Sequence, residues 1–143
     1  MRKIIYCLIL PLVLLLSSCG PMISKFEIET QKGITEPIKI LREDYDNMIK
    51  EKKSFILYIG STTCSSCKKF SQNALNPFIE ETGVVIYRIE TYLIDDAINY
   101  IATPAISVIK DGELVNTVNM LNNEKHFTSK KNIKKYIDRY VTY

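Results

Sequence analysis

The stretch "SFILYIGSTTCSSCKKF" (54–70) joins a short apolar run to two cysteines three residues apart, and it sets the architecture of the chain. The run 54–60 is apolar and ends in glycine, as a buried central strand does. After it, residues that suit one helix face recur at spacings of 3, 4 and 4: Cys67, Phe70, Ala74 and Phe78. Cys64 and Cys67 therefore lie where a strand meets a helix.

Other segments alternate between strand and helix patterns. Strands are predicted at 38–41 and 84–90, helices at 42–53, 95–101 and 128–141, a hairpin at 103–120, and a short strand is conceivable near "KFEIE" (25–29). This order predicts an α/β fold, a sheet with helices on both faces.

Three local signals sharpen these boundaries. Asp111-Gly112 tolerates the positive φ values of a type I′ hairpin turn. Thr128 or Ser129 can cap the last helix. Pro77 lacks an N–H and crowds the carbonyl of Asn73, so the helix after the cysteines should kink or end near it.

The N-terminus has the pattern of an export signal. Arg2 and Lys3 precede the apolar run "IIYCLILPLVLLL", which is shorter than the ~20 residues of a membrane span. The following "LSSC" resembles a bacterial lipobox, which predicts cleavage before Cys19 and lipid on that cysteine. An uncleaved signal anchor and an ordinary secretory signal are the alternatives. We therefore expect a signal peptide at 1–18, a lipid-anchored spacer at 19–36 and one domain at 37–143.

Cleavage would simplify the cysteine count and the charge. Cys7 would leave with the signal and Cys19 would carry lipid, so only Cys64 and Cys67 would remain as thiols among 125 residues. Lysine and arginine would fall from 19 to 17 against 16 acidic residues, a net charge of about +1. This charge does not indicate nucleic-acid binding, and no GxGxxG, GxxxxGK[ST] or GxSxG motif occurs.

A CxxC pair can serve redox exchange, metal binding or a static bridge. Zinc sites use four ligands, whereas this chain offers one pair and the distant His126, which is interpreted as a loop residue. At a helix N-terminus the backbone N–H groups and the dipole lower a cysteine's pKa. This placement favours Cys64 as the attacking thiolate and Cys67 as the resolving thiol, with no metal and no separate cofactor.

A strand running into CxxC, followed later by "IATPAISVIKDGE" (101–113), resembles the thioredoxin superfamily over residues 38–141. Within it, "ILYIGSTTCSSCKKF" (56–70) is similar to bacteriocin transport accessory proteins and related extracytoplasmic thioredoxins. The resemblance implies a central mixed β-sheet flanked by helices on both faces. It also implies a cis peptide bond before Pro104, packed against the active disulfide. Thr103 would then pair with an extended substrate strand and approach Cys64.

The chain also departs from the thioredoxin pattern. It has no tryptophan; Thr63 precedes the first cysteine and is a candidate helix cap. Tyr58 stands where thioredoxins have a buried aspartate that assists proton transfer, and Glu90 is a conceivable substitute, although a solvated strand-end carboxylate is the plainer interpretation. Ser65-Ser66 separates the cysteines, which places a strongly reducing character in doubt. Lys68 and Lys69 either add positive potential or form a solvated surface.

The expected function is that of a membrane-tethered thiol-disulfide oxidoreductase on the extracytoplasmic face of a bacterial cell membrane. Its partners would be thiols and disulfides of exported proteins and a membrane or extracytoplasmic redox partner, with no nucleic acid. The alternative is a redox-idle thioredoxin-fold module that binds a partner protein and keeps Cys64–Cys67 as a static bridge.

Overall fold

The structure, a computed structural model, describes residues 24–143 and centres on a five-stranded mixed sheet. Its strand order is β2 (Ile38–Lys39), β4 (Ile86–Glu90), β3 (Phe55–Gly60), β5 (Ala105–Lys110) and β6 (Glu113–Asn119). β3 runs parallel to β4 and antiparallel to β5, and β4 runs parallel to β2. The central strand β3 is buried along its whole length, as its apolar sequence predicts.

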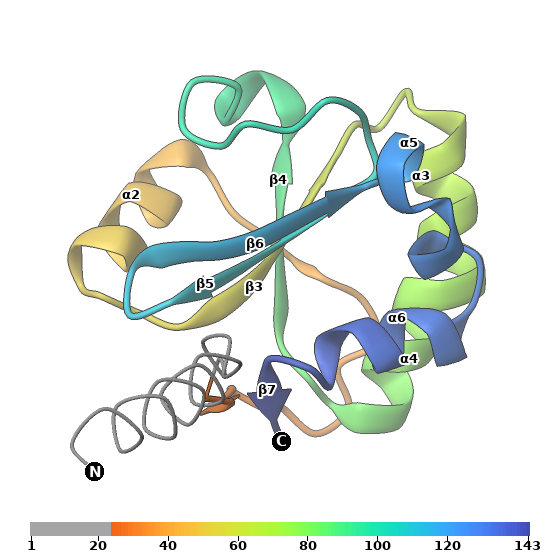
Figure 1. Cartoon of the computed structure of the whole chain (residues 1–143), viewed down its shortest axis with the longest axis horizontal. Coiled ribbons are helices and arrows are strands. Elements are labelled where there is room, and N and C mark those ends of the chain that lie inside the picture. The colour runs from red at the N-terminus through yellow and green to blue at the C-terminus, as the bar shows by residue number, and fades with distance from the viewer. Residues whose placement is uncertain (1–23) are drawn as a thin grey trace, which may run out of the picture.

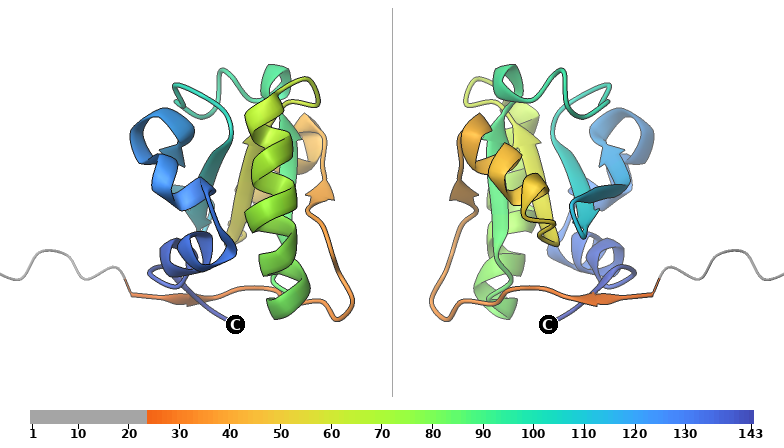
Figure 2. Two further views of the ribbon diagram at one scale, coloured as in Figure 1. Left: turned by 90° about the vertical axis from the view of Figure 1, so that its right-hand side faces the viewer. Right: turned by 90° about the vertical axis from the view of Figure 1, so that its left-hand side faces the viewer.

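Helices cover both faces of this sheet. α2 (Arg42–Lys50) lies on one face, whereas α3 (Ser65–Phe70), α4 (Asn76–Thr82) and α6 (Lys130–Ile137) lie on the other (Figures 1 and 2). Alternate residues of β3 feed two separate apolar clusters: Tyr58 packs on the α3–α6 side, and Leu57 packs on the α2 side. The predicted fold class is confirmed.

The long helix after the cysteines does not end at Pro77. A π-helical turn, Ser71–Leu75, joins α3 to α4, and Pro77 sits in the first turn of α4. A wider turn suits a residue that cannot donate the usual helical hydrogen bond. The predicted interruption is therefore a local change of helix type.

The predicted helix at 95–101 is wrong. Only a 3-10 turn, Thr91–Leu93, and one further turn form, in which the amide of Ile98 donates to the carbonyl of Ile94 at 3.2 Å. Both of these isoleucines are buried. Within this segment, Asp96 forms an ion pair with Arg42 of α2. The chain then continues as a loop to β5.

The hairpin and the last helix follow their predicted signals. Asp111 and Gly112 have φ values of 53° and 78° between β5 and β6, and Ser129 caps α6 by accepting the amide of Asn132 at 3.3 Å. Between them, the sequence patterns did not predict the short helix α5 (Met120–Asn123) and the 3-10 turn Glu124–Phe127.

The predicted boundary between spacer and domain is too late in the chain. β1 (Phe26–Glu27) pairs in parallel with β7 (Val141–Thr142), and Phe26 and Ile28 belong to the core. Residues 26–28 are therefore part of the folded unit, because two apolar residues on one side of a short strand reach the buried face. The predicted signal peptide and Cys19 lie outside the described residues. No helix within 24–143 is long and apolar enough to cross a membrane.

Candidate active site

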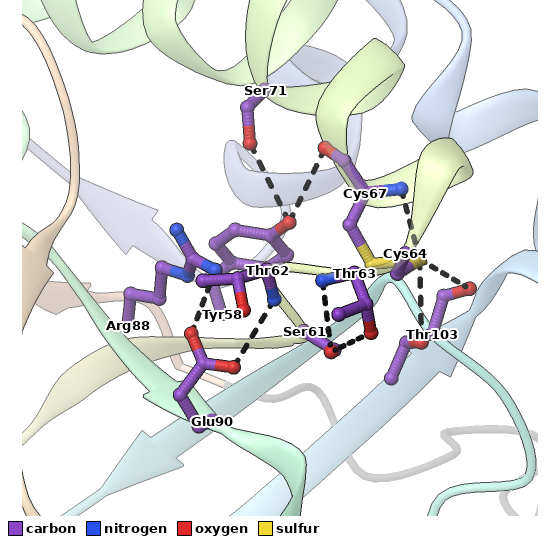
Figure 3. A network of polar contacts seen from close by, with 10 residues as sticks. All are labelled: Tyr58, Ser61, Thr62, Thr63, Cys64, Cys67, Ser71, Arg88, Glu90 and Thr103. Atoms are coloured by element: carbon purple, nitrogen blue, oxygen red, sulfur yellow. Dashed lines mark hydrogen bonds and ion pairs between the residues drawn. A yellow bond between two sulfur atoms is a disulfide. The ribbon is translucent and has the colours of Figure 1, made fainter.

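The loop after β3 delivers Cys64 to the first turn of α3. The amide of Cys64 donates to the carbonyl of Ser61 at 3.2 Å, and Cys64 itself occupies the N-cap position. Its Sγ accepts the amide of Cys67 at 3.1 Å. Thr63, the predicted cap, instead shares a 2.9 Å hydrogen bond with the hydroxyl of Ser61. The capping acceptor of α3 is therefore the Sγ of Cys64 rather than a hydroxyl (Figure 3).

Cys64 and Cys67 form a disulfide with a Cα–Cα distance of 5.2 Å. The two sulfurs differ in access: Cys64 is half-buried, whereas Cys67 is 2% exposed and packs in the core. An incoming thiol or disulfide can therefore reach Cys64 more easily than Cys67. The division into an attacking Cys64 and a resolving Cys67 stays a prediction, and the greater exposure of Cys64 is consistent with it.

The Thr103–Pro104 peptide lies against the disulfide and is cis. The hydroxyl of Thr103 donates to the Sγ of Cys64 at 3.6 Å, a long contact to sulfur (Figure 3). Pro104 is buried, and its carbonyl accepts the amide of Met120 at 3.0 Å. The structure thus brings together four predicted site residues from two segments that are 39 positions apart in the sequence: Cys64, Cys67, Thr103 and Pro104.

Ser66 belongs to the site and was not singled out from the sequence. Its hydroxyl lies 3.1 Å from the Sγ of Cys64 and 3.3 Å from the carbonyl oxygen of Thr103. It can therefore donate its one proton to either acceptor. The only sequence signal for this role was a hydroxyl residue between the cysteines, two positions after the first.

A buried tyrosine of β3 lies next to Cys67. Tyr58 is 1% exposed, and burial raises the pKa of its hydroxyl. The hydroxyl donates to the carbonyl of Cys67 at 3.4 Å and accepts from Ser71 at 3.5 Å. A phenol that stays neutral can supply a hydrogen bond here, but it is a poor base at neutral pH.

Glu90 makes its hydrogen bonds to groups other than the two cysteines. It pairs with Arg88 at 2.9 Å and accepts the amide of Thr62 at 3.2 Å, so it anchors the loop that leads to Cys64. The guanidinium of Arg88 in turn lies 5.6 Å from the centre of the Tyr58 ring. The predicted solvated carboxylate is instead a loop anchor, 22% exposed.

The remaining charged candidates differ in exposure, since Lys68 and Lys69 are exposed on α3 and His126 is half-buried. His126 lies in the 3-10 turn Glu124–Phe127, with its ring 5.0 Å from that of Tyr136, and burial lowers its pKa. Within residues 24–143, no three His, Cys, Asp or Glu side chains gather in a way that could hold a metal ion.

Comparison with known proteins identifies the fold. No protein-family model and no curated protein sequence matches the chain. Among solved structures, thioredoxin from Schistosoma mansoni is 18% identical with a TM-score of 0.55, over 74% of this chain and 96% of that one. A mutant thioredoxin from Halobacterium salinarum is 17% identical with a TM-score of 0.56, over 80% of this chain and 98% of that one.

Oxidised thioredoxin from Plasmodium falciparum is 21% identical to this chain, with a TM-score of 0.52, over 73% of this chain and 99% of that one. Identities this low establish the fold and nothing finer. The chain has a thioredoxin-like fold, with a CxxC disulfide at the start of α3.

Proposed function

We propose that this protein is a thiol-disulfide oxidoreductase that acts on exported proteins from the outer face of a bacterial cell membrane. One observation carries the redox part of the proposal. A disulfide sits at the N-terminus of α3, opposite Thr103 and Pro104, with the more exposed sulfur acting as the helix cap. The similarity to thioredoxins in fold is consistent with it.

The exchange runs through two sulfur attacks. The Cys64 thiolate attacks a substrate disulfide, forms a mixed disulfide and releases one substrate thiolate. Cys67 then attacks the sulfur of Cys64 and releases the second thiolate, so that two electrons pass to the substrate and the protein keeps the Cys64–Cys67 disulfide. Oxidation of a substrate dithiol is the same sequence in reverse.

The site favours the first attack at Cys64. In the reduced protein, the N–H of Cys67 and the hydroxyls of Ser66 and Thr103 all lie where they can stabilise a negative sulfur. The Thr103 backbone borders the disulfide, which suits pairing with an extended substrate strand. The protein needs no cofactor beyond its own cysteines for this chemistry.

The location rests on the N-terminal sequence. Basic residues, a short apolar run and "LSSC" support export and a lipid on Cys19. A lipid anchor would keep the domain at the membrane, near exported proteins and a membrane or extracytoplasmic redox partner. Replacing Cys19 by alanine should release the protein from the membrane fraction, and retention of the variant there would contradict the tether.

The redox proposal is tested by equilibrating the protein with defined ratios of reduced and oxidised glutathione and counting free thiols. We expect two thiols to titrate together with one midpoint. Cys67→Ser should trap a mixed disulfide on Cys64, because the resolving thiol is missing. If no thiols appear at any ratio, the exchange activity is ruled out and the redox-idle binding module remains. Such a module would keep its cellular role in Cys64→Ser, whereas an enzyme would lose it.

A further inference from the structure

A pocket of about 310 Å³ opens beside the disulfide, on the Ser66 side of α3. One wall comes from α3 and the π-helical turn that follows it, and the other comes from the segment after β6. Six of the lining residues matter here: Ser66, Lys69, Phe70, Asn73, Met120 and Phe127. We call this site the Phe70 pocket.

The Phe70 pocket has an apolar floor and a polar rim. Phe70 and Phe127 are 1% and 3% exposed, and their ring centres lie 4.9 Å apart. Met120, a flexible apolar side chain that adapts to different partners, is only partly buried. Lys69 and Asn73 stand exposed at the rim. A floor of this kind favours an apolar group over a charged one.

The walls of the pocket are continuous with the redox site. Ser66 contacts both the Sγ of Cys64 and the carbonyl of Thr103. On the opposite wall, the amide of Met120 donates to the carbonyl of Pro104 at 3.0 Å. A chain segment bound along Thr103 therefore has this pocket at its side.

The two sides of α3 differ in the chemical character of their lining residues. The pocket on the other side of α3, about 220 Å³, is lined mainly by polar and charged residues, Lys68 and Arg88 among them. In contrast, large apolar residues flank the Thr103 side: Ile101 is 69% exposed two residues before Thr103, and Leu121 is 70% exposed next to Met120. Exposed apolar side chains gathered near a site indicate contact with another molecule.

We propose that the Phe70 pocket receives an apolar side chain of an extended polypeptide substrate whose cysteine is attacked by Cys64. This inference rests on the proposed exchange activity and adds a substrate preference to it. In an extended segment, residues two positions from the cysteine point to the same side as the cysteine. The preferred substrates are therefore unfolded or flexible protein segments with a bulky apolar residue at one of those positions.

The test compares two peptide disulfides. They differ only at the residues two positions before and two positions after the cysteine, which are leucine in one peptide and serine in the other. The reduced full chain should react with the leucine peptide about tenfold faster, the factor expected from partial burial of one such side chain. Oxidised glutathione serves as a third substrate that presents no such side chain.

Asn73→Trp should fill the pocket from its exposed rim, at a residue outside the redox machinery. We expect it to abolish the leucine preference and to leave the rate with oxidised glutathione unchanged. Gln72→Trp is the matched control: it places the same bulky side chain on the neighbouring exposed residue, which lines the other pocket. This variant should keep the preference.

Each outcome bears on one inference. Equal rates for the two peptides, a preference that survives Asn73→Trp, or a preference lost equally in Gln72→Trp would overturn the pocket assignment. The same holds if Asn73→Trp slows only oxidised glutathione, since the pocket would then serve a small anionic disulfide near Lys69. Failure of the wild-type protein to react with any of the three disulfides would instead refute the exchange activity itself.

Discussion

The hydroxyl of Ser66 donates to the backbone carbonyl of Thr103 at 3.3 Å, across 37 positions of sequence. The same hydroxyl lies 3.1 Å from the Sγ of Cys64. In the disulfide form, the carbonyl is the better acceptor for its proton. After reduction, a thiolate on Cys64 competes for that proton, because charged acceptors form the stronger hydrogen bonds. Ser66 is thus a positioning residue that links the CxxC helix to the Pro104 loop.

Ser66→Ala should lower the equilibrium ratio of Cys64 thiolate to thiol about fivefold, the factor that corresponds to a lost hydrogen bond of about 1 kcal/mol. A titration of the thiolate's ultraviolet absorbance in the reduced protein measures this ratio. Ser66→Thr should restore it, and Ser65→Ala, at the exposed neighbour, should not change it. An unchanged titration curve in Ser66→Ala would confine Ser66 to a structural role.

Ile28→Ala should reduce the free energy of unfolding by about 2–4 kcal/mol, since it removes a buried core side chain that is 6% exposed. The preceding residue, Glu27, is exposed, so Glu27→Ala should change the free energy of unfolding by less than about 0.5 kcal/mol. Urea unfolding measures both values. Equal, small effects would mean that residues 26–28 belong to the spacer predicted from the sequence and not to the core.

Gly112→Ala should destabilise the protein more than Gly33→Ala. Both glycines have positive φ, 78° and 82°, which costs an alanine about 1–2 kcal/mol. At Gly112 an added Cβ would also meet the carbonyl oxygen of Ile49 at 2.6 Å, whereas nothing lies within 4 Å at Gly33. Thermal unfolding of the two variants isolates this close approach of the hairpin turn to the end of α2. Equal losses of stability would show that the turn can move away at little cost.

Tyr58→Phe should weaken the loss of stability at alkaline pH. Burial raises the pKa of Tyr58 above its ordinary value of about 10. The unfolded chain therefore releases this proton first as the pH rises, and the free energy of unfolding falls from about pH 10 upward, by as much as ~1.4 kcal/mol per pH unit. The phenylalanine variant lacks this contribution. Urea unfolding measures the free energies of unfolding of the two proteins across pH 8–11. If Tyr58 ionised equally in the folded and unfolded states, the plots of these free energies against pH would be parallel.

Much of the fold could be predicted because local patterns carry it. The buried run at 54–60 and the helical spacing that begins at Cys67 both depend on residues close in sequence, and both formed as predicted. The Asp111-Gly112 turn likewise needs only positive φ at two adjacent residues. The predicted helix at 95–101 does not form, because a single turn from Ile94 to Ile98 already buries both isoleucines.

Some features of the candidate site could likewise be predicted from the sequence and others could not. The cysteine pair and its place at a helix start follow from the sequence, and the cis bond at Pro104 followed only from resemblance to a known family. The contact of Ser66 with Thr103 and the Met120–Phe127 wall of the Phe70 pocket did not follow from either. Each of these features joins segments that are distant in the sequence, so no local pattern reports it.

The sequence alone therefore established a CxxC pair between a buried strand and a helix, because hydrophobic spacing and helix-end chemistry are local. Only the tertiary structure showed which sulfur is exposed, where the hydroxyl of Ser66 points and that residues 26–28 join the core. These properties depend on how distant segments pack against one another. The stretch around Cys64 and Cys67 predicts the type of chemistry, and the packing of Thr103, Met120 and Phe127 around it shapes what the site can bind.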